Sequence, residues 1–130
     1  MTKVFLGSGR SNVNEWKQHP VVPNAVYQWI QTGLPNYAEI PEYVTTLTGD
    51  SSIWPVLGAS SVYSPTSKRF LVILALEQRY ANIVLTPKIV RAWNWTINWA
   101  AFGDPTIDES RQEDGDENRT LPDELGYIIS

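Results

Sequence analysis

The sequence contains no cysteine and only one histidine, His19. Without thiols the chain has no disulfides, thiolate zinc sites, iron–sulfur clusters or cysteine nucleophiles. His19 is therefore the only imidazole ligand and the only side chain that ordinarily titrates near neutral pH. It stands between Gln18 and Pro20 in a stretch without apolar periodicity, which predicts a surface or capping residue. We expect no metal site and no small-molecule cofactor.

Long hydrophobic runs are also missing. The longest covers the seven residues 70–76, whereas a membrane-spanning helix needs about 20. The apolar stretch ahead of Gly7 is shorter than the hydrophobic region of a signal peptide. We therefore expect no membrane insertion, no secretion by a signal peptide, and a location in the cytoplasm or in a virion.

Charge is unevenly distributed along the chain. The net charge is −4, from 10 basic and 14 acidic residues. Residues 1–103 carry eight basic and five acidic side chains, a net charge of +3. Residues 104–130 carry two basic and nine acidic side chains, a net charge of −7. The sequence thus predicts a mildly basic body followed by an acidic C-terminal tail.

The remaining pattern predicts a single, mainly α domain. Apolar residues at one-turn spacing, with glycine or proline near the ends, predict helices over residues 24–32, 41–48, 67–82 and 87–102. A strand is the alternative for residues 70–76, because a short apolar run fits both structures. The predicted fold is a small helical domain of three to five helices. It comprises an extended N-terminal arm at 1–22, a helical body at 23–103 and an acidic C-terminal tail at 104–130.

The helix predicted over residues 87–102 has the clearest boundaries. Thr86 can cap its start, Pro87 suits the first helical position, and Gly103 follows its end. Only one narrow strip of this helix would be polar. A helix that is apolar nearly all round lies at the centre of its domain or between its own core and a partner.

Six tryptophans are many for a chain of 130 residues. Such residues fill a core, anchor a subunit interface, or stack on bases or sugars. Trp16, next to Lys17 in the predicted arm, is the favoured anchor onto a second subunit. The oligomer interface is predicted to contain four aromatic residues, Trp16, Trp95, Trp99 and Phe102.

A nucleic-acid partner is a further prediction. Basic side chains on two of the predicted helices would contact the phosphates of RNA or DNA. These residues are Lys68, Arg69, Arg79, Lys88 and Arg91. The net charge of +3 on the body is modest for this role, since dedicated nucleic-acid domains are more basic.

No catalytic motif is present in the sequence. The glycine turn at residues 7–9 lacks the remaining positions of a phosphate-binding fingerprint. Residues 114–118 match only the beginning of a calcium-binding loop. No Gly-x-Ser-x-Gly segment positions a serine nucleophile, and most carboxylates lie in the acidic tail. We therefore expect that the protein is not an enzyme.

Two functional hypotheses follow from these features. The first is a non-enzymatic, self-assembling structural protein, such as a viral capsid or coat subunit or a nucleocapsid-type subunit, that forms homo-oligomers and contacts nucleic acid through its basic body. The alternative is a small acidic binding module, such as an immunity protein, an antitoxin or a nucleic-acid mimic. In that case the acidic tail at 104–130 would occupy a basic surface of its target.

Overall fold

The computed structural model describes residues 3–50, 56–76 and 84–110. This part of the chain is mainly β, so the prediction of a mainly α fold is wrong. Its strands are β1 (Val4–Arg10), β2 (Lys17–Gln18), β3 (Ala25–Gln31), β4 (Glu42–Thr48), β5 (Val56–Leu57), β6 (Arg69–Leu76) and β7 (Thr96–Gly103). The helical elements are a 3-10 turn, η1 (Val13–Glu15), and one short helix, α1 (Pro87–Ala92).

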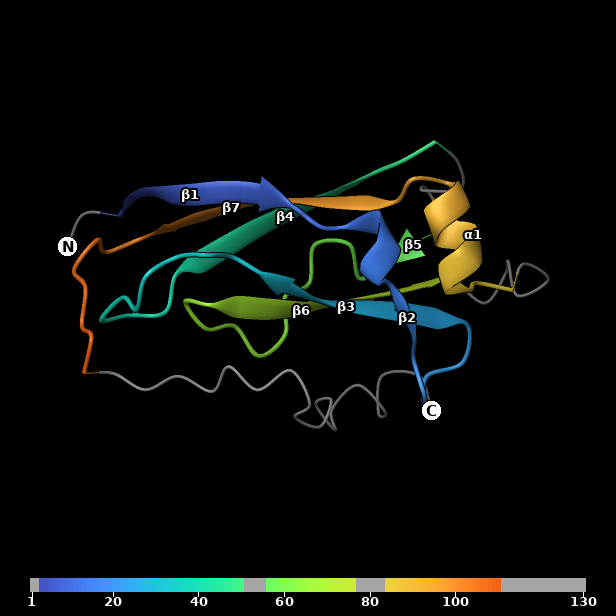
Figure 1. Ribbon diagram of the computed structural model, residues 1–130, viewed down its shortest axis with the longest axis horizontal. Helices are drawn as coiled ribbons and strands as arrows, with labels where there is room; N and C mark the ends of the chain where they lie inside the picture. The colour runs from blue at the N-terminus through green and yellow to red at the C-terminus, as the bar shows by residue number, and fades with distance from the viewer. Residues whose placement is uncertain (1–2, 51–55, 77–83, 111–130) are drawn as a thin grey trace.

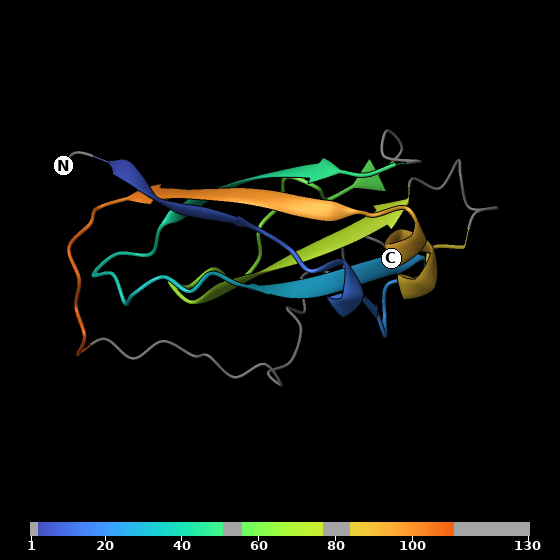
Figure 2. The ribbon, with the colours of Figure 1, turned by 45° about the horizontal axis from the view of Figure 1, so that its top comes forward.

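The described strands form two antiparallel sheets (Figure 1). The first sheet has the order β1-β7-β4, and the second has the order β2-β3-β6-β5. Figure 2 shows the sheets as two layers that face each other. Helix α1 lies at one end of this sandwich, opposite the end at which β1 begins (Figure 1).

The hydrophobic core fills the space between the two sheets. In β7 the burial alternates, so that Ile97, Trp99 and Ala101 point inward. The second sheet contributes side chains such as Val26 and Phe70 to the same cluster. The rings of Phe70 and Trp99 meet edge to face across the interior, with centroids 6.0 Å apart. This arrangement is typical of two packed sheets, each of which buries one face.

Strand β3 replaces the helix predicted over residues 24–32. Its residues are rich in β-branched and aromatic side chains, which favour a pleated strand. Val26 and Ile30 face the core, whereas Tyr27 and Trp29 lie on the opposite face. Because both faces carry large side chains, the apolar positions also fit a one-turn spacing. That coincidence made the helix prediction wrong.

Strands β4 and β6 correct two more helix predictions. Residues 42–48 form β4, in agreement with the strand preference of its β-branched threonines. For residues 70–76 the strand alternative is confirmed, because they lie in β6. Strand β6 is buried on both faces, so its sequence is a continuous apolar run without alternation. Residues 77–82 of the predicted helix lie outside the described residues.

The segment predicted as a helix over 87–102 divides into α1 and β7. Its predicted start is confirmed, because the Thr86 side chain accepts a hydrogen bond from the N–H of Ile89 at 3.2 Å and Pro87 begins the helix. The helix ends early, since Asn94 has a φ of +59° and leaves the helical conformation. Strand alternation then takes over from Thr96.

The N-terminal segment is not an extended arm. Strand β1 pairs with β7 in the first sheet, and β2 pairs with β3 in the second. Residues 4–18 therefore link the two layers. The glycine turn predicted at residues 7–9 lies within β1. A Cβ atom at Gly9 would lie 2.8 Å from the Trp99 ring, so this glycine serves close packing.

Candidate functional site

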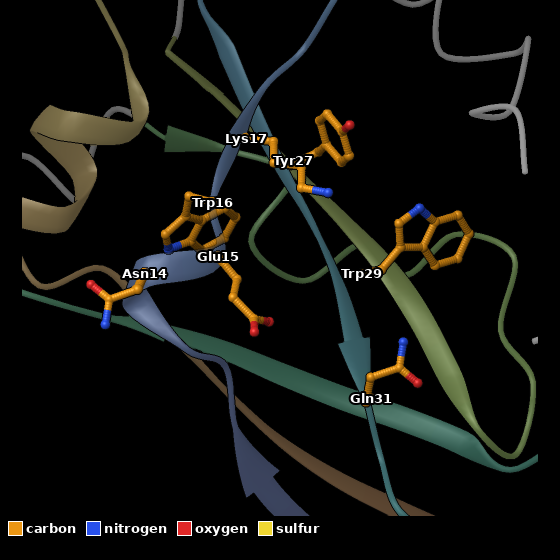
Figure 3. A pocket seen from close by; sticks show the side chains of 7 residues that line it. All are labelled: Asn14, Glu15, Trp16, Lys17, Tyr27, Trp29 and Gln31. Carbon is orange, nitrogen blue, oxygen red and sulfur yellow. The ribbon is translucent and has the colours of Figure 1, made fainter. Parts of the chain in front are cut away.

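A pocket of about 340 Å³ lies where η1 and β2 approach β3. It is lined by Asn14, Glu15, Trp16, Lys17, Tyr27, Trp29 and Gln31 (Figure 3). The volume is at the lower end of the range of about 300–1,000 Å³ that is typical of small-molecule sites. A ligand of one or two rings fits this size.

Asn12 and Gln28 hold η1 against β3. The Asn12 side chain caps η1 by accepting a hydrogen bond from the N–H of Asn14 at 2.9 Å. Its backbone N–H donates to the Gln28 side-chain oxygen at 3.1 Å, and the Gln28 amide donates to the Asn12 carbonyl at 2.9 Å. Since Gln28 is buried, its neighbours on β3, Tyr27 and Trp29, lie on the opposite face of the strand.

Trp16 forms a rigid wall of the pocket. Only 4% of its surface is exposed, and its indole N–H donates to the Trp95 carbonyl at 3.0 Å. Trp95 belongs to the core between the sheets and is fully buried. The hydrogen bond therefore ties the pocket wall to the centre of the sandwich.

Tyr27 and Trp29 form the aromatic platform of the site. They are half-buried and occupy alternate positions of β3, so both lie on one face of the second sheet. The guanidinium carbon of Arg69 lies 4.2 Å from the centre of the Trp29 ring, a cation–π contact with a fully buried cation. His19 meets the Tyr27 ring edge to face, with centroids 5.8 Å apart. Each ring is thus held by a neighbouring side chain.

The polar groups of the pocket are exposed and of several kinds. Glu15 offers a carboxylate, Lys17 an ammonium group, and Asn14 and Gln31 offer amides that both donate and accept. Lys17 is the strand partner of Tyr27, and in Figure 3 the two side chains lie beside each other. Glu15 and Gln31 approach the pocket from η1 and from β3. The site combines stacking surfaces with hydrogen-bonding groups.

The pocket holds one carboxylate, whereas most glycoside hydrolysis uses a pair of them. Among the residues that the structure describes, no three histidine, aspartate or glutamate side chains gather in a way that would hold a metal ion. The lining combines aromatic surface with a few hydrogen-bonding groups, an arrangement that can bind a small ligand.

A second, smaller pocket lies at the other end of the sandwich. Its volume is about 260 Å³, and it is lined by Lys3, Glu39, Ile40, Glu42, Phe102, Gly103 and Asp104. Lys3 already forms an ion pair with Glu42. The backbone N–H and the hydroxyl of Thr106 donate to Asp104 and lower the pKa of its carboxyl group. This pocket offers one aromatic ring, so it lacks a paired stacking surface.

Four of the five basic residues predicted to contact nucleic acid are described by the structure, and these four do not form one surface. Lys68 precedes β6, and its ammonium group donates to the Leu34 carbonyl at 2.9 Å. Arg69 is buried against Trp29. Lys88 and Arg91 share α1, which lies at the opposite end of the sandwich from the start of β6 (Figure 1). Arg79 lies outside the described residues.

Three of the four predicted interface residues belong to the core of the chain itself. Trp16, Trp95 and Trp99 are 4%, 0% and 6% exposed. Phe102 alone reaches the surface, where its ring lies edge to face with Phe5 at 5.8 Å. In a helix over residues 87–102, Trp95, Trp99 and Phe102 would lie near one another, but in β7 Phe102 lies on the other face of the sheet from Trp99.

The sequence prediction missed Tyr27, Trp29 and Gln31 as members of one site. Residues two positions apart point in different directions on a helix but to the same face of a strand. The helix predicted over residues 24–32 therefore separated these side chains. The enrichment of β-branched and aromatic residues in this segment was the available signal.

Comparison with known proteins adds no identification. The chain matches no protein-family model, no curated protein and no solved structure. Within the described ranges, no helix has the length and apolarity that crossing a membrane requires.

Proposed function

We propose that the protein is a non-catalytic binding module that takes a saccharide unit in the pocket between η1, β2 and β3. The observation that carries this proposal is the aromatic platform of Tyr27 and Trp29 beside mixed polar side chains in one concavity. A sugar ring has a face of C–H groups that packs on an aromatic ring. Its edge carries hydroxyl groups that both donate and accept hydrogen bonds.

The polar groups of the pocket match this edge. Hydroxyl groups donate to carboxylate and amide oxygens, and they accept from ammonium and amide N–H groups. Glu15 and Lys17 provide one of each charge, and Gln31 provides both a donor and an acceptor. Specific recognition in small pockets relies on a few such groups beside apolar and aromatic surface.

A nucleic-acid strand fits this pocket less well. Binding of a strand relies on several cations along its backbone and on stacked bases. The lining of the pocket contains one accessible cation, Lys17, and one carboxylate, Glu15, so its net charge offers little attraction to a phosphate backbone. The nucleic-acid contact predicted from the sequence remains a prediction, and an oligonucleotide belongs in the same binding experiment.

Saturation-transfer NMR with a panel of methyl glycosides of neutral, amino and acidic sugars tests the proposal. A base stacked on an aromatic side chain contributes about 1–3 kcal/mol, and we expect a similar value for a sugar ring on Trp29, so Trp29→Ala should weaken the affinity of the best glycoside by about fivefold or more. The exposed side chain of Gln31 allows a second variant, Gln31→Ala, which keeps the core intact and should weaken binding by about threefold.

Phe5→Ala provides the control, because Phe5 is 60% exposed on the other sheet. This variant should bind like the unmodified protein. Thermal unfolding of every variant separates a lost contact from a lost fold. The proposal would be contradicted if an oligothymidylate bound and no glycoside did. It would also be contradicted if the Gln31→Ala and Trp29→Ala variants bound the glycoside with the same affinity as the unmodified protein.

Self-assembly is the second candidate function, and one surface supports it. Phe5 and Val44 are 60% and 57% exposed at one end of the outer face of the first sheet, where Phe102 lies between their strands. Clustered apolar residues at a surface are typical of an interaction site. That the protein is a homo-oligomeric capsid or coat subunit thus remains a proposal. The alternative of an acidic module rests on the tail, of which residues 111–130 lie outside the described residues.

A further inference from the structure

His19 closes the turn that joins β2 to β3. Its Nδ1 atom accepts hydrogen bonds from the N–H groups of Val21 at 3.1 Å and Val22 at 2.9 Å. The backbone N–H of His19 donates to the Ala25 carbonyl at 2.9 Å. The capping role predicted from the sequence is confirmed, but the side chain is only 7% exposed.

These hydrogen bonds require a neutral imidazole. A nitrogen that accepts a hydrogen bond carries no proton, so the ring proton resides on Nε2. Nε2 is buried and has no hydrogen-bond partner in the described part of the chain. Protonation of Nδ1 would abolish both acceptor contacts and place a positive charge in a buried position.

Among the described residues, β2, β3 and β6 present no carboxylate that would stabilise an imidazolium. Lys17 of β2 is a like charge two residues away, and Tyr27 is the one ionisable side chain of β3. The one ionisable side chain of β6 is Arg69, which pairs with Gln31 at the far end of β3. Residues 17–31 contain no carboxylate. Burial lowers the pKa of His19 below its usual value of 6.5.

We propose that His19 is a positioning residue that makes the ligand site acid-sensitive: protonation opens the turn at residues 19–24, displaces Lys17 and Tyr27, and weakens ligand binding. The turn is coupled to the site because Lys17 pairs with Tyr27 and Tyr27 contacts His19. The anchor of the turn is Val22, which is 2% exposed and packs with Leu71 and Ile73. This inference rests on the proposed saccharide site.

The direction of the pH effect follows from the lowered pKa. In the open turn His19 titrates near 6.5, and in the closed turn it titrates lower. Above pH 6.5 the closed turn therefore keeps its full stability. As the pH falls from 6.5 to the lower pKa, the open form binds more protons and the closed form is progressively destabilised.

His19→Asn is the matched variant for a test. An asparagine Oδ1 atom can accept from N–H groups two and three residues ahead, as Nδ1 does, and it does not titrate. We compare the ratio of glycoside affinities at about pH 7.5 and pH 5, using the tightest-binding methyl glycoside of the panel. Between pH 7.5 and pH 5 the glycoside affinity of the unmodified protein should fall by about fivefold or more, and that of the His19→Asn variant by about twofold or less.

The inference would be overturned if the two proteins lost the same affinity at pH 5, or if neither lost any. Proton–nitrogen NMR of the Val21 and Val22 amides over the same pH range provides a readout without ligand. Both signals should shift together with the His19 ring signals in the unmodified protein. If no glycoside binds at pH 7.5, the proposed function fails, whereas amides that do not respond between pH 7.5 and 5 overturn the switch alone.

Discussion

Gly9 allows the Trp99 ring to lie directly on β1. A Cβ atom at this position would lie 2.8–2.9 Å from three atoms of the indole, closer than real contacts allow. Trp99 is confined on its other sides by Phe70 and Tyr43. The ring therefore has no room to retreat, and a methyl group at position 9 would be forced into a filled core.

Gly9→Ala should lower the free energy of unfolding by about 1–3 kcal/mol, as overpacked cores do. Urea unfolding followed by tryptophan fluorescence measures this change. The control is Ser8→Ala on the same strand, because Ser8 is exposed and should tolerate the change. Equal stability of the Gly9→Ala variant and the unmodified protein would show that β1 does not approach Trp99 this closely.

Arg69 illustrates how a residue type alone misleads about function. Its charge suggested a phosphate contact, yet the guanidinium group is fully buried against Trp29. On β6, Arg69 is the partner of Gln31, so it lies beside the ligand site rather than on a basic surface. The composition gives the basic residues of the chain. Which of their side chains are exposed to solvent depends on the pairing of the strands.

The junction between α1 and β7 depends on the left-handed conformation of Asn94. Its φ of +59° ends the helix and turns the chain into β7. Asparagine and glycine adopt this conformation readily, whereas a β-branched residue does so at a cost of about 1–2 kcal/mol. The exposed side chain of Asn94 makes this position suitable for substitution.

Asn94→Val should therefore lower the free energy of unfolding by about 1–2 kcal/mol, and Asn94→Gly should change it by less than about 0.5 kcal/mol. Chemical denaturation of both variants measures the difference. If the helix instead continued through residues 87–102, the order would reverse, because valine is a better helix former than glycine.

Two of the misassigned strands, β3 and β6, carry large side chains on both faces. Strand β3 buries Val26 and Ile30 on one face and supports Tyr27 and Trp29 on the other. Strand β6 is buried on both faces. A strand covered on both sides has no polar alternation, so its apolar residues can also be fitted to a helical spacing. The neighbours that cover the outer face are distant in sequence.

At the scale of the whole molecule, the sandwich leaves part of one outer face apolar. Phe5 and Val44 lie on the two edge strands of the first sheet, with β7 between them. If this surface joins two copies, light scattering coupled to size-exclusion chromatography should give a mass above that of one chain. The double variant Phe5→Ser/Val44→Thr should raise the dissociation constant by about tenfold or more.

Leu57→Thr is the control, because Leu57 is 55% exposed on β5 of the other sheet. It should leave the oligomeric mass unchanged. A monomeric mass for the unmodified protein at high concentration would contradict assembly through this surface. The saccharide proposal does not depend on that outcome, because its pocket lies on η1, β2 and β3.

The sequence by itself determined the local features of the chain. Helix α1 begins at Thr86 and Pro87, as their capping chemistry predicts, and His19 caps its turn. The lack of cysteine excludes disulfides and thiolate chemistry in any fold. These properties depend on a residue and its immediate neighbours, so they can be inferred without knowledge of the fold.

The tertiary structure decided the fold class and the site. Val4 pairs with Gly103, and the indole of Trp16 is fixed by Trp95, so contacts between distant segments select strands where local spacing also permits helices. Because β3 is a strand, Tyr27 and Trp29 share a face and form one aromatic platform. The site therefore exists only through pairings that link opposite parts of the chain.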